Sequence, residues 1–142
     1  MADAPDDDEL VETLIGVFRE IDGLFSTVSR QQGLTPQQAQ LLCFAQHLQP
    51  AFGELATLLH CDKTNVTGLV DRLQRRGLLT RQPDPNDRRM TRVRLTPQGE
   101  AVTAQFKQAI GATLTTRFSS WPSAERDNLV RLLQSATTEL RP

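Results

Sequence analysis

The amino-acid sequence predicts a mainly α-helical protein of the α+β class, with six helices and one two-stranded β-hairpin. Three observations support this fold class. Apolar residues recur at intervals of three and four through most of the chain, which is the period of an amphipathic helix. Capping residues, prolines and glycines divide these stretches into separate helices. One segment alternates apolar and charged residues after a turn-rich sequence, which is typical of a β-hairpin.

The composition indicates a soluble globular protein with one core. The chain has 142 residues, of which 38% are hydrophobic and 23% are charged. No apolar run is long enough to cross a bilayer, and two cysteines do not make a disulfide framework. We therefore expect a cytoplasmic protein that has no membrane partner.

Local signals mark the ends of the first two helices. The first helix ends at Gly33, because glycine readily adopts the left-handed conformation that closes a helix. Its apolar stripe consists of Leu14, Phe18, Ile21, Phe25 and Val28. Thr35, Pro36 and Gln38 then predict a second helix that begins with a capping box.

Two short helices and the hairpin follow. A helix from about Phe52 to Leu59, without a good capping side chain, precedes a helix that Asp62 caps and Gly77 stops. The core face of the second of these helices consists of Val66, Leu69, Val70 and Leu73. A strand over residues 79–82 and a turn over residues 83–87 lead to the return strand. That strand alternates the inward residues Thr91, Val93 and Leu95 with the outward residues Arg92 and Arg94.

The outer helices predict a homodimer. Thr96 and Pro97 open a long helix, which the segment 121–123 separates from the last helix. The outer helices carry more apolar surface than one small core can cover, so we expect them to pack against a second copy; a closed monomeric bundle is the alternative. The predicted dimer interface consists of Leu14, Phe18, Ile21, Phe118, Leu129, Leu132, Leu133 and Leu140.

The middle of the chain predicts binding to a polyanion. The two short helices and their tight turn have helix-turn-helix spacing. The segment from Asp62 to Leu95 holds nine basic and four acidic residues, whereas the rest of the chain has an excess of acidic residues. The outward face of the second short helix carries small polar residues first and arginines later. This order suits contacts with base edges and then with phosphates.

The hairpin tip strengthens the prediction of DNA binding. It carries Arg88 and Arg89, and arginines are favoured in the narrow, negative minor groove of A·T tracts. A helix-turn-helix followed by a basic hairpin is a winged helix-turn-helix, and its predicted partner is double-stranded DNA. The candidate DNA-binding residues are Lys63, Thr64, Asn65, Thr67, Gly68, Arg72, Arg75, Arg88, Arg89 and Arg92, with Asp87 placed to orient the wing.

The stretch from Glu54 to Gly99 resembles the MarR family of bacterial transcription regulators. The resemblance rests on the sequence from Glu54 to Leu79 and on two wing segments, Pro83-Asp-Pro-Asn-Asp-Arg-Arg and Val93-Arg-Leu-Thr-Pro-Gln-Gly99. It implies an obligate homodimer that binds a palindromic operator, with Asp62 to Arg72 as the recognition helix and Arg89 as the minor-groove arginine. Gly68 stands where the family often has an arginine.

The resemblance also implies three functional parts within one integrated domain. These are an N-terminal dimerisation helix (1–34), a winged helix-turn-helix lobe (35–96) and C-terminal dimerisation helices (97–142). The implied function is ligand-responsive repression, with a small aromatic effector of unknown identity and no cofactor.

Other functions have weaker support. His47, Arg19 and Arg30 could face an effector crevice, but a solvated position is expected for each. A redox- or metal-sensing regulator on the same scaffold is one alternative, although Cys43 and Cys61 are expected to be core thiols and no metal site is expected. A winged-helix module that binds proteins is another. The sequence has no recognisable catalytic pattern, so we do not expect an enzyme.

Overall fold

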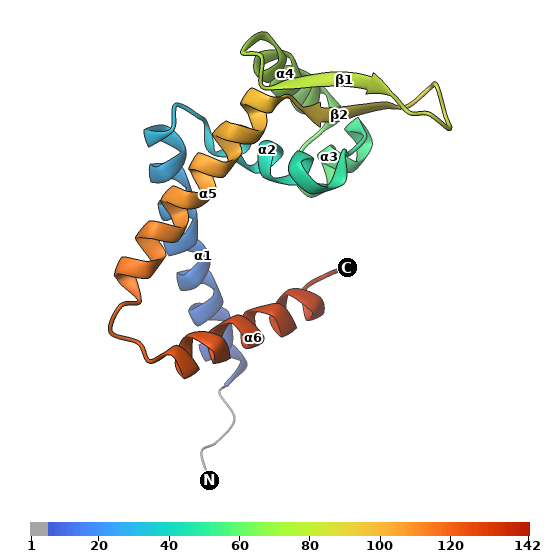
Figure 1. Cartoon of the computed structure of the whole chain (residues 1–142). Helices are drawn as coiled ribbons and strands as arrows, with labels where there is room; N and C mark the ends of the chain where they lie inside the picture. Colours follow the sequence, from blue (N-terminus) through green and yellow to red (C-terminus); the bar gives the residue numbers. More distant parts are fainter. Residues whose placement is uncertain (1–5) are drawn as a thin grey trace. The chain divides into compact units, whose positions relative to one another are not determined.

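The computed structural model describes residues 6–142, which form six helices and one two-stranded antiparallel sheet (Figure 1). The elements are α1 (Asp7–Gln31), α2 (Pro36–Leu48), α3 (Phe52–Leu58), α4 (Lys63–Arg75), β1 (Leu79–Pro83), β2 (Thr91–Leu95), α5 (Pro97–Arg117) and α6 (Ser123–Glu139). This order confirms the predicted fold class. The chain forms two compact units, one up to Gln108 and one from Ala109 onward, and each is described by itself.

The predicted helix ends follow from local hydrogen bonds. At the start of α2, Gln38 N donates to Thr35 Oγ1 at 3.2 Å and Thr35 N donates to Gln38 Oε1 at 3.1 Å, which completes the capping box. After α1, Gly33 adopts a φ of +73°, and Leu34 N donates to Ser29 O at 2.9 Å. These short-range contacts explain why the sequence predicts the helix boundaries well.

The helix-turn-helix and the hairpin form one lobe within the first unit. Helix α3 has no side-chain cap at Ala51, as expected, and it ends one residue earlier than predicted. Strand β1 extends one residue beyond the predicted strand, and it pairs with β2 in a register that places Leu79 opposite Leu95. In Figure 1, α2, α3, α4 and the hairpin gather together.

The core of the first unit lies beneath α4 and the hairpin. The four predicted core residues of α4 are all buried, and burying each such side chain contributes about 1.5–3 kcal/mol. Other buried members of this core are Val28, Leu41, Leu42, Leu55, Leu78, Leu79, Val93, Leu95 and Phe106. Phe106 packs edge-on against Phe25, with ring centroids 5.4 Å apart. The burial of the four core residues of α4 fixes which face of that helix is left to solvent.

A glycine allows α5 to begin directly beside the end of α4. A Cβ atom at Gly99 would lie 1.9 Å from the carbonyl oxygen of Leu78, so only glycine permits this approach. Thr96 Oγ1 accepts from Gly99 N at 3.0 Å and donates to Gly77 O at 2.6 Å. The start of α5 is therefore tied to the turn that follows α4.

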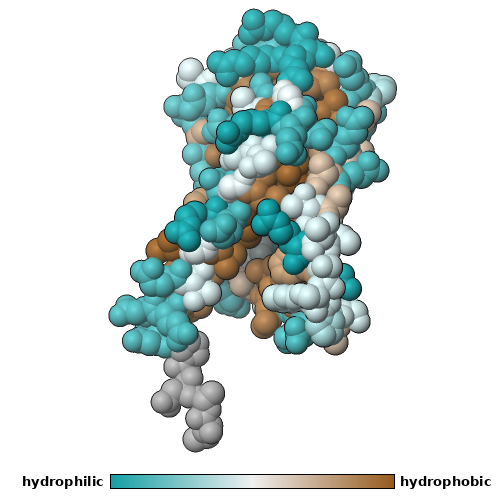
Figure 2. All heavy atoms as spheres, turned by 90° about the vertical axis from the view of Figure 1, so that its left-hand side faces the viewer, coloured by the Kyte–Doolittle hydropathy of each residue, from teal (hydrophilic) through white to brown (hydrophobic). Residues whose placement is uncertain are grey.

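The outer helices leave large apolar side chains in contact with solvent. On α1, the exposed fractions are 41% for Leu14, 71% for Phe18 and 47% for Ile21. Figure 2 shows hydrophobic surface along α1, beyond the hydrophilic residues of its first turn. In the second unit no residue of α6 is buried, and Phe118 packs against Trp121 with ring centroids 4.9 Å apart.

Candidate DNA-binding surface

Helix α4, the predicted recognition helix, presents its predicted polar face to solvent. Asp62 caps the helix, because its Oδ1 atom accepts from Asn65 N at 2.8 Å. Of the predicted DNA-binding residues on α4, Gly68 is half-buried and six are exposed, namely Lys63, Thr64, Asn65, Thr67, Arg72 and Arg75. A Cβ atom at Gly68 would meet no atom within 4 Å, so this position offers open space rather than a packing contact.

The side chains at the start of α4 have hydrogen-bonding capacity to spare. Thr67 Oγ1 donates to Lys63 O at 2.9 Å, which leaves the lone pairs of the hydroxyl and its methyl group available to a ligand. Within the described residues, the side chains of Thr64 and Asn65 have no hydrogen-bond partner. An amide and a hydroxyl that are free of protein partners suit contacts with base edges.

The turn between α3 and α4 depends on His60. This residue adopts a φ of +51°, and the amide of the next residue, Cys61, donates to Ala56 O at 3.0 Å. His60 thus closes the helix-turn-helix turn.

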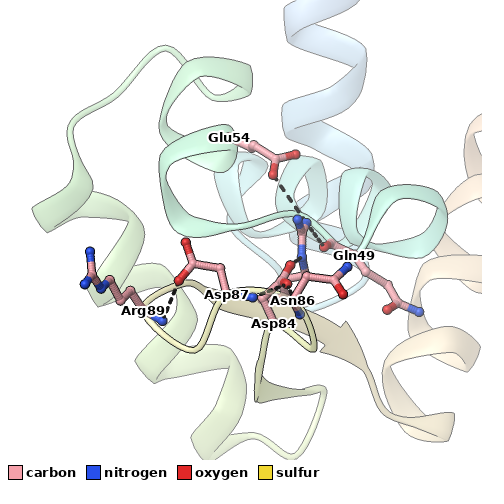
Figure 3. A network of polar contacts seen from close by, with 7 residues as sticks. Gln49, Glu54, Asp84, Asn86, Asp87 and Arg89 are labelled. Carbon is pink, nitrogen blue, oxygen red and sulfur yellow. Dashed lines mark hydrogen bonds and ion pairs between the residues drawn. The ribbon is translucent and has the colours of Figure 1, made fainter.

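The wing tip is organised by an aspartate that the sequence did not single out. Asp84 is only 7% exposed, and its Oδ1 atom accepts from Asn86 N at 2.7 Å and from Asp87 N at 3.0 Å. Figure 3 shows these contacts at the start of the turn. The signal for this role was the order Asp-Pro-Asn in a turn, because aspartate side chains often accept from backbone amides two residues on.

Asp87 orients the wing through the backbone of Arg89. Its Oδ1 atom accepts from Arg89 N at 3.0 Å, and its carbonyl accepts from Met90 N at 3.0 Å. The contact with Arg89 is visible in Figure 3. The Arg88 and Arg89 side chains are both exposed, and neither has an ion-pair partner within the described residues.

Arg92 occupies a different environment from the other candidate arginines. It is half-buried, and its guanidinium contacts Asp84, Glu54 and the carbonyl of Gln49. Asp84 pairs with Nε, whereas Nη1 donates to Gln49 O at 3.1 Å and to Glu54 Oε1 at 3.3 Å. The side chain therefore faces the lobe itself and not only solvent, which differs from the outward orientation expected from the strand pattern.

Three further arginines of the basic segment also contact protein groups, and one of them is Arg75, whose Nε donates to Asp71 O at 3.3 Å. Arg81 on β1 pairs with Asp71 on α4, and its guanidinium carbon lies 5.5 Å from the ring centre of Phe52. Arg76 Nη1 donates to Gly33 O at 2.9 Å. The nine cations of the segment are thus not equivalent, because some hold the lobe together and others are free to meet a ligand.

A groove separates the wing from the start of α4. Its volume is about 530 Å³, and its lining includes Phe52, Glu54, Lys63, Thr67, Arg89 and Met90. Exposed cations from both the recognition helix and the wing therefore border one hollow, which suits a polyanion that runs between them.

The pKa of the Asp84 carboxyl lies below its usual 3.8, mainly because Arg92 donates to the charged form. The amides of Asn86 and Asp87 lower it further, and burial opposes them. The pKa of Arg92 is raised by the same pairing. The charged pair is therefore the favoured state of the wing at neutral pH.

Acid is expected to remove the stability that the Asp84 charge provides. Because the folded-state pKa is the lower one, this stability is present above the unfolded pKa of about 3.9 and is lost as the pH falls through the folded pKa. Thermal unfolding from about pH 6 to about pH 3 tests this, with Asp84→Asn as the reference. The difference in Tm between the protein and this variant should shrink with falling pH; a constant difference would contradict the assignment.

Cys43 and Cys61, which were expected to be core thiols, are free and only partly buried. Burial raises the pKa of the Cys43 thiol, and Lys107 offsets this only in part. A raised pKa leaves less thiolate at neutral pH and so disfavours a reactive thiol.

Within residues 6–142, no group of three or more metal-ligating side chains could hold a metal ion. The described helices are also too short or too polar to cross a membrane.

The three residues considered for an effector site are all exposed. The side chain of Arg19 is 78% exposed and pairs with its neighbour Glu20, and Arg30 is exposed at the end of α1. His47 Nε2 lies 3.2 Å from Lys107 Nζ, on the facing helix α5. These positions agree with the solvated surface that was expected for each.

Comparisons with known proteins agree with this geometry. A model of the MarR family matches residues 34–91. The multiple antibiotic resistance protein MarR of Escherichia coli (strain K12) is 36% identical over 101 residues, covering 69% of each protein. The crystal structure of apo wild-type MarR from Escherichia coli superposes with a TM-score of 0.76 at 26% identity, covering 95% of this chain and 98% of that chain. CouR from Rhodococcus jostii RHA1, solved with bound p-coumaroyl-CoA, gives a TM-score of 0.73 at 26% identity and 95% coverage of both chains.

Proposed function

The chain belongs to the MarR family of transcriptional regulators, and from this premise we propose that it is a ligand-responsive repressor that binds a pseudo-palindromic operator as a homodimer. The family consists of regulators and not enzymes, in agreement with the predicted lack of catalytic activity. Because its target is chromosomal DNA, we expect the protein in the cytoplasm.

The observation that carries the proposal is the shared placement of two DNA-reading elements on one lobe. Lys63 and Thr67 on α4 and Arg89 at the wing tip border the same groove. A recognition helix in the major groove and a wing arginine in the neighbouring minor groove need this arrangement.

The proposed contacts follow from the hydrogen-bonding groups and charges that each side chain does not already use within the protein. Thr64, Asn65 and Thr67 would meet base edges, with Gly68 leaving room for a base or its methyl group. Lys63, Arg72 and Arg75 would meet phosphates, and Arg88 and Arg89 would enter or flank the minor groove. Arg92 would make no direct contact with DNA, because its guanidinium already has three acceptors in the protein.

The exposed apolar residues of the outer helices support the homodimer. On α6, Leu132 is 51% exposed, Leu133 46% and Leu140 70%, in addition to the exposed stripe on α1. Large apolar side chains that recur along one face of a helix are rarely left to solvent in a monomer. Of the other predicted interface residues, Phe118 and Leu129 are half-buried within the chain, so they would contribute less area.

The functional division into 1–34, 35–96 and 97–142 remains a proposal of the same kind. It differs from the two compact units, because α1 and the first part of α5 pack with the DNA-binding lobe. A helix can belong to the core of one unit at one end and offer an interface at the other.

A small aromatic effector is the proposed signal. CouR, which has a similar fold, was solved with p-coumaroyl-CoA, and this supports a ligand of aromatic character. We propose that the ligand changes the separation of the two lobes of the dimer, so that both no longer fit the operator at once.

Selection of bound fragments from sheared genomic DNA tests the proposal. We expect enrichment of a short pseudo-palindrome whose half-sites lie about one helical turn apart, near a transcription start. Footprinting of the selected fragment should show protection centred on the symmetry axis. Equal recovery of all fragments, or one unpaired half-site, would contradict a sequence-specific homodimer.

A further inference from the structure

Arg92 joins three separate segments of the DNA-binding lobe. Its guanidinium lies between Asp84 at the wing turn, Gln49 after α2 and Glu54 on α3. Two acceptors are carboxylates and the third is a backbone carbonyl, which together suit the fixed fork of a guanidinium. A side chain held in this way has little freedom to turn toward a phosphate.

Asp84 connects this arginine to the shape of the wing tip. One carboxylate oxygen accepts from the amides of Asn86 and Asp87, while the other pairs with Arg92. A second aspartate forms the same kind of contact further along the tip, because Asp87 Oδ1 accepts from Arg89 N. Figure 3 shows how these labelled residues follow one another around the tip. The position of Arg89 thus depends on a chain of contacts that begins at Arg92.

Backbone contacts place the same network against the helix-turn-helix. Ala51 forms an isolated antiparallel bridge with Arg92, and Val93 N donates to Pro50 O at 3.0 Å. The base of the hairpin is therefore attached to the segment that leads into α3. The Arg92 and Asp84 side chains extend this attachment toward the tip.

We propose that Arg92 and Asp84 are positioning residues for DNA binding, which hold the wing tip in place relative to α3 without touching DNA. The inference rests on the proposed function and deepens it. It distinguishes the cations that neutralise phosphates from Arg92, which holds such a cation in position. It also makes an acidic residue a requirement for binding a polyanion.

Charge alone and positioning predict opposite effects at Asp84. Removing a negative charge near a DNA-binding surface should strengthen binding through the long-range field. If Asp84 acts by holding Arg92 and the turn, Asp84→Asn should instead weaken binding. The variant is nearly isosteric and lies outside the hydrophobic core, so the fold of the lobe should be retained.

The experiment measures the affinity for the selected fragment, at several salt concentrations, of the full-length protein and three variants. Arg92→Gln and Asp84→Asn should each bind about tenfold more weakly or worse, with the salt slope of the unchanged protein. Arg94→Gln is the matched control, because Arg94 lies on the same strand face, is exposed and has no ion-pair partner in the described part of the chain. It loses the same charge without loosening the tip.

Two measurements separate positioning from a general structural effect. Hydrogen exchange of hairpin amides, in the absence of DNA, should be faster at the tip in Arg92→Gln and Asp84→Asn but unchanged in Arg94→Gln. The double variant should bind no more weakly than the worse single variant, because both changes break one network.

Two results would overturn the proposal, and a third would reject the proposed function instead. Binding by Asp84→Asn that equals or exceeds that of the unchanged protein would overturn the proposal, and so would a salt slope reduced by about one per subunit in Arg92→Gln. Failure of the unchanged protein to select any DNA would instead reject the proposed function. The exchange measurement would still report whether the two residues order the wing.

Discussion

Replacing both Leu132 and Leu133 by glutamate is expected to convert the homodimer into monomers and to weaken operator binding by about 10²–10⁴-fold. Both side chains are about half exposed in the single chain, at 51% and 46%, so glutamate is compatible with its fold. In a dimer the same positions would bury unpaired charges, which is strongly unfavourable. Sedimentation equilibrium measures the mass, and fluorescence anisotropy on the selected fragment measures the affinity.

The size of this effect comes from linkage between the two lobes. Once one lobe is bound, the second meets its half-site at a high effective concentration, and a monomer loses that advantage without losing any contact of its own. Each monomer should therefore keep the weak affinity of a single lobe. A chain shortened after Arg117, which lacks α6, should behave in the same way.

A control on the same helix makes the test specific. Thr138 is exposed and lies on the side of α6 opposite Leu132 and Leu133, given 100° of rotation per residue. Thr138→Glu should remain dimeric and bind normally. If the double glutamate variant kept the mass and affinity of the unchanged protein, α6 would not form the interface.

The fold was predictable because its determinants are local. The capping box at Thr35, the cap at Asp62 and the glycines at 33 and 77 each act within a few residues of their position. The outward face of α4 followed from the 3.6-residue period of four core residues. These hydrogen bonds join residues that are close in sequence and need no distant segment, and so they could be predicted from the sequence.

The environment of Arg92 was not predictable for the opposite reason. Strand alternation correctly separates it from Val93, but alternation cannot say whether the outer face meets water or another segment. The answer depends on Gln49 and Glu54, which lie 43 and 38 residues away in sequence. The burial of Asp84 has the same origin, because a turn-rich sequence indicates a turn and not what covers it. The sequence therefore predicted the lobe and its basic character, but it could not predict which charged side chains pair with other groups of the lobe.

Arg89→Ala is expected to weaken operator binding by about 10–100-fold and to lower the salt slope by about two for the dimer, one for each subunit. The tip should keep its conformation, because Asp87 holds residue 89 through the backbone amide, which alanine also has. The loss therefore reports the guanidinium alone. Binding isotherms at four or more salt concentrations give both quantities.

The base composition beneath the wing adds an independent readout. If the guanidinium lies in a narrow minor groove, replacing A·T pairs there by G·C pairs should weaken binding of the unchanged protein. The same replacement should have little effect on Arg89→Ala, because the group that senses groove width is gone. Arg131→Ala removes an exposed cation of α6 and should match the unchanged protein in affinity, slope and base preference. An Arg89→Ala variant that kept its A·T preference would show that another residue, with Arg88 the nearest candidate, reads the minor groove.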